Sequence, residues 1–257
     1  MLVDTHCHLD AAAFDGDRAA VADAATQVGV GRIVVPAVER ANFGAVASVC
    51  RDYSCCFAAF GIHPMYVDQA QEADLDALRE MVLREHPLAV GEIGLDRFVE
   101  PRDEPRQEFY FSAQLEIARD ANLPVLLHVR RAIDQVLKQL RRYPVPGGIA
   151  HAFNGSRQQA DEFIKLGFKL GFGGAMTFPR ASRIRELAAK LPLDAIVLET
   201  DAPDIPPEWK VGARNTPDQL PGIAQILADL RGIAVQEVAE ATTANAAAVL
   251  PGLARLH

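Results

Sequence analysis

The sequence has few cysteines, and their spacing excludes two common kinds of site. The 257 residues include only four, Cys7, Cys50, Cys55 and Cys56, and none of them form a Cys-x-x-Cys pair. A zinc knuckle or a thioredoxin-like redox pair requires that spacing. We therefore expect buried, reduced thiols, as in a cytoplasmic protein.

Long apolar runs and an excess of positive charge are also absent. No stretch of 18 consecutive apolar residues occurs, and the first residues lack the basic and apolar segments of a signal peptide. We expect a cytoplasmic location, no membrane attachment and no obligate protein partner. Lysine and arginine number 26 against 34 aspartate and glutamate, a net charge of −8. This balance argues against a surface that wraps duplex DNA, but it permits a local basic rim.

Apolar strand-like runs alternate with helical patterns along the whole length. The predicted strands are 2–8, 32–36, 56–62, 88–93, 124–128, 148–151, 168–172 and 195–200. The predicted helices are 17–29, 41–52, 74–85, 106–121, 132–142, 156–166, 181–191, 218–231 and 235–250. Eight such units without a linker predict an α/β chain, a single-domain (β/α)8 TIM barrel over residues 1–257 with C-terminal helices. An open doubly wound sheet is disfavoured because no Gly-rich dinucleotide fingerprint follows the first strand.

Two histidines lie on alternate residues at the end of the first predicted strand. His6 and His8 would point to the same side of an extended chain, and paired imidazoles suit zinc or another transition metal. Asp4 shares that face and is predicted to orient one of the histidines. A His-x-His pair is short enough to arise by chance, so the prediction depends on ligands elsewhere.

Residues that can bind metal end five of the eight predicted strands. They are His6 and His8, Glu92, His128, His151 and Asp201. The carboxyl ends of barrel strands carry the chemistry, and buried polar groups rarely gather there without a function. Six nitrogen and oxygen ligands exceed the four of one tetrahedral ion. We therefore predict a two-metal site with Glu92 as the bridging carboxylate.

Seven separated blocks of the sequence resemble the TatD family of metal-dependent deoxyribonucleases, which have amidohydrolase-type barrels. The blocks are His6–Leu9, Gly61–Pro64, Gly91–Asp96, His128, His151–Phe153, Glu199–Pro203 and Arg214–Pro217. The resemblance implies that His6, His8 and Asp201 hold one divalent ion, that His128 and His151 hold the other, and that Glu92 bridges them. It also implies that the substrate is a nucleic acid and that DNA is hydrolysed, with single strands trimmed from a 3′ end.

Other residues have predicted roles around these ligands. Asp201 is predicted to accept the proton of the attacking water while it binds metal, and His63, Arg130 and Arg214 are candidates for contact with substrate. Glu199 is predicted to support a ligand. Trp209 and Phe178 are candidates for stacking on a base. Imidazole favours zinc, and the carboxylates permit magnesium or manganese.

Two alternatives remain open at this point. The same metal-activated water could attack a carbonyl, as in an amidohydrolase or a deacylase of aminoacyl-tRNA. Arg130 and Arg214 pointing away from the metals would favour that chemistry. A metal-binding scaffold without activity is the other alternative, and the intact set of six ligands argues against it.

Overall fold

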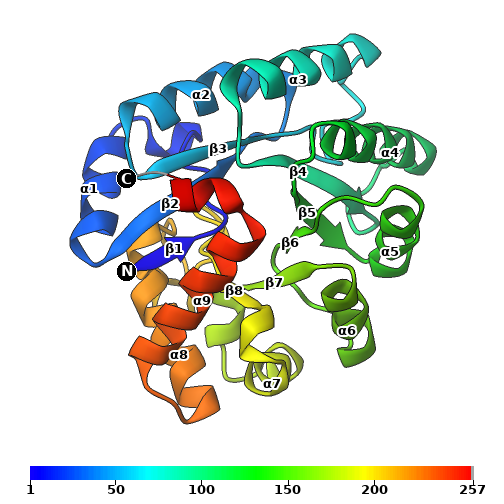
Figure 1. Ribbon diagram of the computed structural model, residues 1–257. Coiled ribbons are helices and arrows are strands. Elements are labelled where there is room, and N and C mark those ends of the chain that lie inside the picture. The colour runs from blue at the N-terminus through cyan, green and yellow to red at the C-terminus, as the bar shows by residue number, and fades with distance from the viewer. Residues whose placement is uncertain (256–257) are drawn as a thin grey trace.

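The predicted strands form one parallel barrel, as the sequence pattern indicated. The computed structural model describes residues 1–255, and its strands follow chain order around the sheet (Figure 1). They are β1 (Leu2–Asp4), β2 (Val30–Pro36), β3 (Cys56–Phe60), β4 (Ala89–Asp96), β5 (Val125–Arg130), β6 (Gly148–Ala150), β7 (Phe168–Phe172) and β8 (Ile196–Leu198). The (β/α)8 prediction is confirmed.

The helices lie on the outside of the barrel. Within residues 1–255 they are α1 (Arg18–Gln27), α2 (Phe43–Asp52), α3 (Glu72–Glu85), α4 (Glu104–Asp120), α5 (Ile133–Arg142), α6 (Arg157–Lys165), α7 (Ser182–Lys190), α8 (Leu220–Arg231) and α9 (Val235–Val249). Local sequence explains where one of them begins. Helix α6 begins with a capping box in which Gln159 N donates to Ser156 Oγ at 3.2 Å and Ser156 N donates to Gln159 Oε1 at 2.9 Å.

Two predicted strand boundaries differ from the structure in ways that matter for the site. Strand β1 ends at Asp4 rather than at His8, and β4 continues to Asp96 rather than ending at Ile93. The barrel is closed beyond β1 and β8, where Cys7 bridges Ala202 in parallel. Backbone hydrogen bonds therefore fix the two polar segments that follow these strands side by side.

Helix α9 covers the amino-terminal end of the barrel. Its Ala246 and Val249 pack in one cluster with inward-facing Val3, Val34 and Leu126. Asn245 Nδ2 donates to Ile196 O at 2.7 Å and ties the helix to β8. Figure 1 shows the helix, in red, lying across the barrel. The strands' carboxyl ends are thereby left as the open end, where the polar residues gather.

The described residues contain neither a helix suited to a bilayer nor a disulfide. No helix among them is both long and apolar enough to span a membrane. The four cysteines are free, with Cys7 and Cys56 buried and Cys50 and Cys55 partly exposed. The expectation that all four are buried is therefore half correct.

Candidate active site

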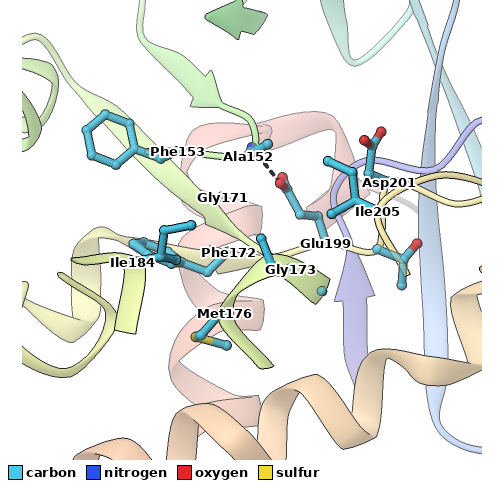
Figure 2. A pocket seen from close by; sticks show the side chains of 13 residues that line it. Ala152, Phe153, Gly171, Phe172, Gly173, Met176, Ile184, Glu199, Asp201 and Ile205 are labelled. Atoms are coloured by element: carbon cyan, nitrogen blue, oxygen red, sulfur yellow. Dashed lines mark hydrogen bonds between the residues drawn. The ribbon is translucent and has the colours of Figure 1, made fainter. Parts of the chain in front are cut away.

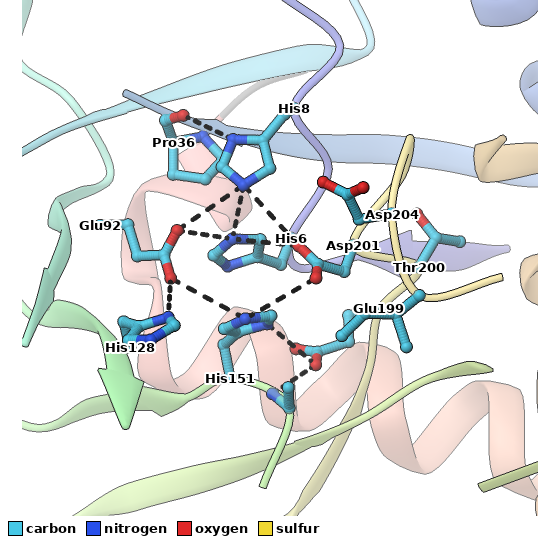
Figure 3. Close-up of polar contacts among 12 residues, drawn as sticks. His6, His8, Pro36, Glu92, His128, His151, Glu199, Thr200, Asp201 and Asp204 are labelled. Carbon is cyan, nitrogen blue, oxygen red and sulfur yellow. Dashed lines mark hydrogen bonds and ion pairs between the residues drawn. The ribbon is translucent and has the colours of Figure 1, made fainter. Parts of the chain in front are cut away.

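Glu92 lies at the centre of a cluster of histidines at the open end of the barrel (Figure 3). It is 2% exposed, and its two carboxylate oxygens face different sets of imidazoles. Oε2 is 3.2 Å from His6 Nε2 and 3.6 Å from His8 Nε2. Oε1 is 3.0 Å from His128 Nδ1 and 3.8 Å from His151 Nε2. The two oxygens thus look towards two separate groups of nitrogen ligands.

His6, His8 and Asp201 form the first of these groups. The two Nε2 atoms are 3.3 Å apart, and each is 3.7 Å from Asp201 Oδ1. Two ligands of a tetrahedral ion, each about 2.05 Å from the metal, lie about 3.3 Å apart. Main-chain hydrogen bonds of 2.8 Å, from Asp201 N to His6 O and from His8 N to Ala202 O, hold this spacing. The donor set and its spacing therefore fit a metal ion.

His128 and His151 form the second group with Glu92 Oε1, and His63 joins them. His63 Nε2 lies 3.5 Å from the same oxygen. His63 Nδ1 accepts a hydrogen bond from Met65 N at 3.1 Å, so the neutral ring carries its proton on Nε2 and points an N–H at the cluster. The structure therefore places His63 among the candidate ligands, where it serves better as a hydrogen-bond donor than as a ligand.

The far nitrogens of three histidines are held by oxygen acceptors. His8 Nδ1 lies 3.2 Å from Pro36 O, His128 Nε2 lies 3.0 Å from Asp96 Oδ2, and His151 Nδ1 lies 3.1 Å from Glu199 Oε1. Each contact fixes the proton on the far nitrogen and leaves the near nitrogen's lone pair for a metal. This is the pattern of metal-binding histidines. Buried His6 Nδ1 has no such partner among the described residues.

The electrostatics of the cluster follow from its burial and its mixed charges. Burial opposes ionisation of Glu92, yet His63 and His6 hold its pKa well below the usual value. Burial, with neighbouring His128, lowers the pKa of His63 to about 4, so this ring is neutral at pH 7. Burial also works against protonation of His151, but Glu199 and Asp201 outweigh it and raise the pKa to about 10. The carboxylates of Glu199 and Asp201 therefore favour a positive charge on the His151 ring or beside it.

Glu199 holds His151 from below, as the sequence predicted for a supporting carboxylate. Its Oε1 accepts hydrogen bonds from His151 Nδ1 at 3.1 Å and from Ala152 N at 2.6 Å (Figure 2). Gly171 leaves room for it, since a Cβ there would lie 2.1 Å from Glu199 Oε2. Gly173 is similarly close, with a Cβ 2.8 Å from Glu199 O. Gly171 of β7 is therefore needed for the approach of the carboxylate, and Gly173, just after β7, for the approach of the Glu199 backbone.

Two carboxylates act differently from the sequence prediction. Asp4 was expected to orient an imidazole. It instead accepts backbone hydrogen bonds from Thr200 N at 2.9 Å and His6 N at 3.3 Å, because it lies below the rings. No role was predicted for Asp96, although its carboxylate contacts His128 Nε2. Its signal was present in the sequence: Asp96 is four residues after Glu92, and residues i and i+4 of a strand share a face.

A groove of about 1470 Å³ opens over the cluster and is lined by His8, His63, Glu92, His128, His151 and Asp201. Arg130, which the sequence made a candidate for contact with substrate, also lines the groove. Arg214 lies outside this lining: its guanidinium binds Asp17 at 2.6 and 2.9 Å and covers Phe14. Arg214 is thus held by Asp17 outside the groove lining, and its predicted contact with substrate is not supported by this geometry.

The aromatic and basic residues along the groove also differ from those expected. Trp209 and Phe178 do not line it, whereas Phe98 does. Arg131 and Arg183 join Arg130 there. Phe98 and Arg131 lie in loops, and Arg183 lies in the first turn of α7. None of the three belongs to a sequence motif, so their position depended on the fold.

Comparison with known proteins identifies close relatives. The sequence model of the family described as TatD related DNase matches residues 3–251. The uncharacterized metal-dependent hydrolase YjjV of Escherichia coli is 42% identical over 95% of both chains. The crystal structure of YjjV superposes with a TM-score of 0.94, at 40% identity over 97% of this chain and 98% of that one. The 3′-5′ ssDNA/RNA exonuclease TatD of Escherichia coli is 31% identical over 95% of this chain and 96% of its own.

Proposed function

The chain belongs to the TatD-related DNase family and is a metal-dependent hydrolase, and from this premise we propose that it cleaves phosphodiester bonds of single-stranded DNA from a 3′ end. The observation that carries the proposal is Glu92. Its two oxygens face two groups of ligands at the floor of a groove larger than an ordinary small-molecule pocket. A relative 31% identical is named as a 3′-5′ exonuclease on single-stranded DNA and RNA.

Two divalent ions are proposed to occupy these groups. His6, His8 and Asp201 would hold one, His128 and His151 the other, and Glu92 would bridge them. Four imidazoles with two carboxylates suit zinc or manganese better than magnesium, which prefers oxygen ligands. When bound, the ions would supply a nucleophilic water at neutral pH and neutralise charge on the phosphate.

The residues themselves account for the movement of the proton. Asp201 is 14% exposed at its side chain and projects into the groove, so its carboxylate can take the proton of a water in line with the phosphate. His63 is neutral and presents Nε2–H to the same place, where it can donate to a phosphate oxygen. Glu92 stays ionised and balances the positive charge of the site.

Phosphate is favoured over a carbonyl substrate by the charge on the rim. Of the two arginines expected to contact phosphate, Arg130 lines the groove and Arg214 does not. Arg131 and Arg183 replace it beside Arg130, so three guanidinium groups line the groove. Guanidinium groups pair well with phosphate oxygens, whereas a neutral amide substrate has no need of them.

The test is a metal-dependent screen with matched variants. Chelator-stripped enzyme is reloaded with zinc, manganese or magnesium and given 5′-labelled single-stranded DNA, duplex DNA, RNA, and amide or ester substrates. We expect a ladder that shortens from the 3′ end of the single strand. Asp201→Asn should slow its appearance by about two to four orders of magnitude, whereas Asp194→Asn, at the opposite end of β8, should not. Cleavage confined to amides or carboxylic esters, with no phosphodiester cleaved, would refute the proposal.

A further inference from the structure

One part of the groove rim combines an aromatic ring with two guanidinium groups. None of these side chains is a candidate metal ligand. The Arg130 guanidinium carbon lies 3.7 Å from the centroid of the Phe98 ring, and that of Arg131 lies 4.5 Å from it. All three residues line the groove. We call Phe98, Arg130 and Arg131 the rim stack.

The rim stack is fixed to the metal cluster through Asp96. Asp96 Oδ2 is 3.0 Å from His128 Nε2, while Oδ1 accepts hydrogen bonds from Phe98 N at 2.7 Å and Val99 N at 3.0 Å. Arg130 follows His128 by two residues in β5, roughly 7 Å along the strand. The stack therefore lies next to the place of reaction, in a position set by the same carboxylate that holds a candidate ligand.

The side chains of the rim stack are available to a ligand. Phe98 is 43% exposed, although a large apolar side chain is normally buried. Arg130 and Arg131 are exposed, and neither forms an ion pair within residues 1–255. The remaining arginine of the groove, Arg183, is instead engaged by Asn154 Oδ1 at 2.7 Å. Two unpaired cations beside an exposed ring match the charge and the aromatic face of a nucleotide.

Charge is distributed unevenly around the groove. Arg130 ends β5, Arg131 follows it directly, and Arg183 lies in the first turn of α7. Asp134, also in this part, accepts a hydrogen bond from Gln159. The opposite part, formed by the loops after β8, β1 and β2, presents three acidic side chains, Asp204, Asp10 and Glu39. Phosphates are attracted to the first part and repelled by the second. A strand can therefore lie with its end over the acidic part and its remaining phosphates towards the rim stack.

We propose that the rim stack is a nucleotide-binding subsite for the part of a single strand that stays bound after cleavage. The guanidinium groups of Arg130 and Arg131 pair with a phosphate next to the one that reacts, and Phe98 holds those groups in place and contacts the base. This subsite rests on the proposed function, because it assigns the strand a position relative to that reaction. It makes Phe98 a determinant of nucleic-acid affinity.

Binding and turnover test the subsite separately. Binding is measured by fluorescence anisotropy with a labelled phosphorothioate oligodeoxynucleotide that resists hydrolysis. We expect Phe98→Ala to weaken binding about tenfold or more, with rescue by Phe98→Trp. Arg130→Ala/Arg131→Ala should reduce the slope of log affinity against log salt concentration by about 0.7, the value for one phosphate contact on a single strand. Matched controls are Phe109→Ala, a 48% exposed phenylalanine on α4, and Arg157→Ala, which lies outside the groove.

Turnover supplies the second measurement. We compare kcat/KM for the oligonucleotide with kcat/KM for bis(p-nitrophenyl) phosphate, which has no base and no neighbouring phosphate. The ratio of the first value to the second should fall about tenfold in Phe98→Ala. A Phe98→Ala enzyme with wild-type affinity and an unchanged ratio would overturn the subsite while leaving the proposed function intact. Wild-type enzyme that cleaves no diester would overturn the proposed function, and the anisotropy result would still decide the subsite.

Discussion

The close approach of Gly171 to Glu199 allows a direct test of how His151 is held. A Cβ atom on residue 171 would lie 2.1 Å from Glu199 Oε2 and 2.6 Å from Glu199 Cδ. Glu199 is 1% exposed and its other oxygen is bound by His151 and Ala152. Because the carboxylate is enclosed on both sides, Gly171→Ala should push it away from His151.

Two effects of different kinds are expected from Gly171→Ala. Overpacking in a buried site costs about 1–3 kcal/mol, which lowers Tm by roughly 2–10 °C in a chain of this length. Loss of the carboxylate behind a metal-binding histidine weakens metal affinity about 10- to 100-fold. The loss of affinity should therefore be the clearer result.

The assay is zinc affinity in buffers of fixed free zinc, beside a thermal melt. Gly16→Ala is the matched control, since a Cβ there meets no atom within 4 Å. Glu199→Ala removes both the clash and the carboxylate, so Gly171→Ala/Glu199→Ala should bind zinc no more weakly than Glu199→Ala alone. A Gly171→Ala protein with wild-type zinc affinity would refute the assignment of Glu199 as the support of His151.

Three further predictions concern other members of the site. Asp201→Asn should keep much of its metal but lose catalysis by about two to four orders of magnitude, whereas His6→Ala should lose metal first and be partly restored by excess metal; elemental analysis beside turnover distinguishes them. Asp96→Asn should weaken metal binding about 10- to 100-fold, measured by zinc affinity, because its amide cannot replace the carboxylate at His128. Arg214→Ala should leave KM for a single strand unchanged, while Arg130→Ala raises it; equal effects in steady-state kinetics would contradict the structure.

The metal cluster itself was largely predictable from local pattern. The residues at the ends of five predicted strands are those that the structure brings together around Glu92, and this follows from the parallel arrangement of barrel strands, which puts all carboxyl ends at one edge. Their assignment as metal ligands stays a prediction until metal binding is measured. The position of Asp96 also follows from strand alternation, because it lies four residues after Glu92.

The surroundings of the cluster were decided by tertiary structure. Arg214 and Arg131 look alike in sequence, as arginines in loops after strands. Asp17, 197 residues away along the chain, binds Arg214 outside the groove, while Phe98 holds Arg131 on its rim. Which partner an arginine meets depends on contacts between distant loops, and such contacts leave no periodic pattern in the sequence. The amino-acid sequence by itself determined the barrel and the inventory of ligands, because both follow from the spacing of residues within strands. Only the folded chain determined which charged and aromatic side chains face the substrate.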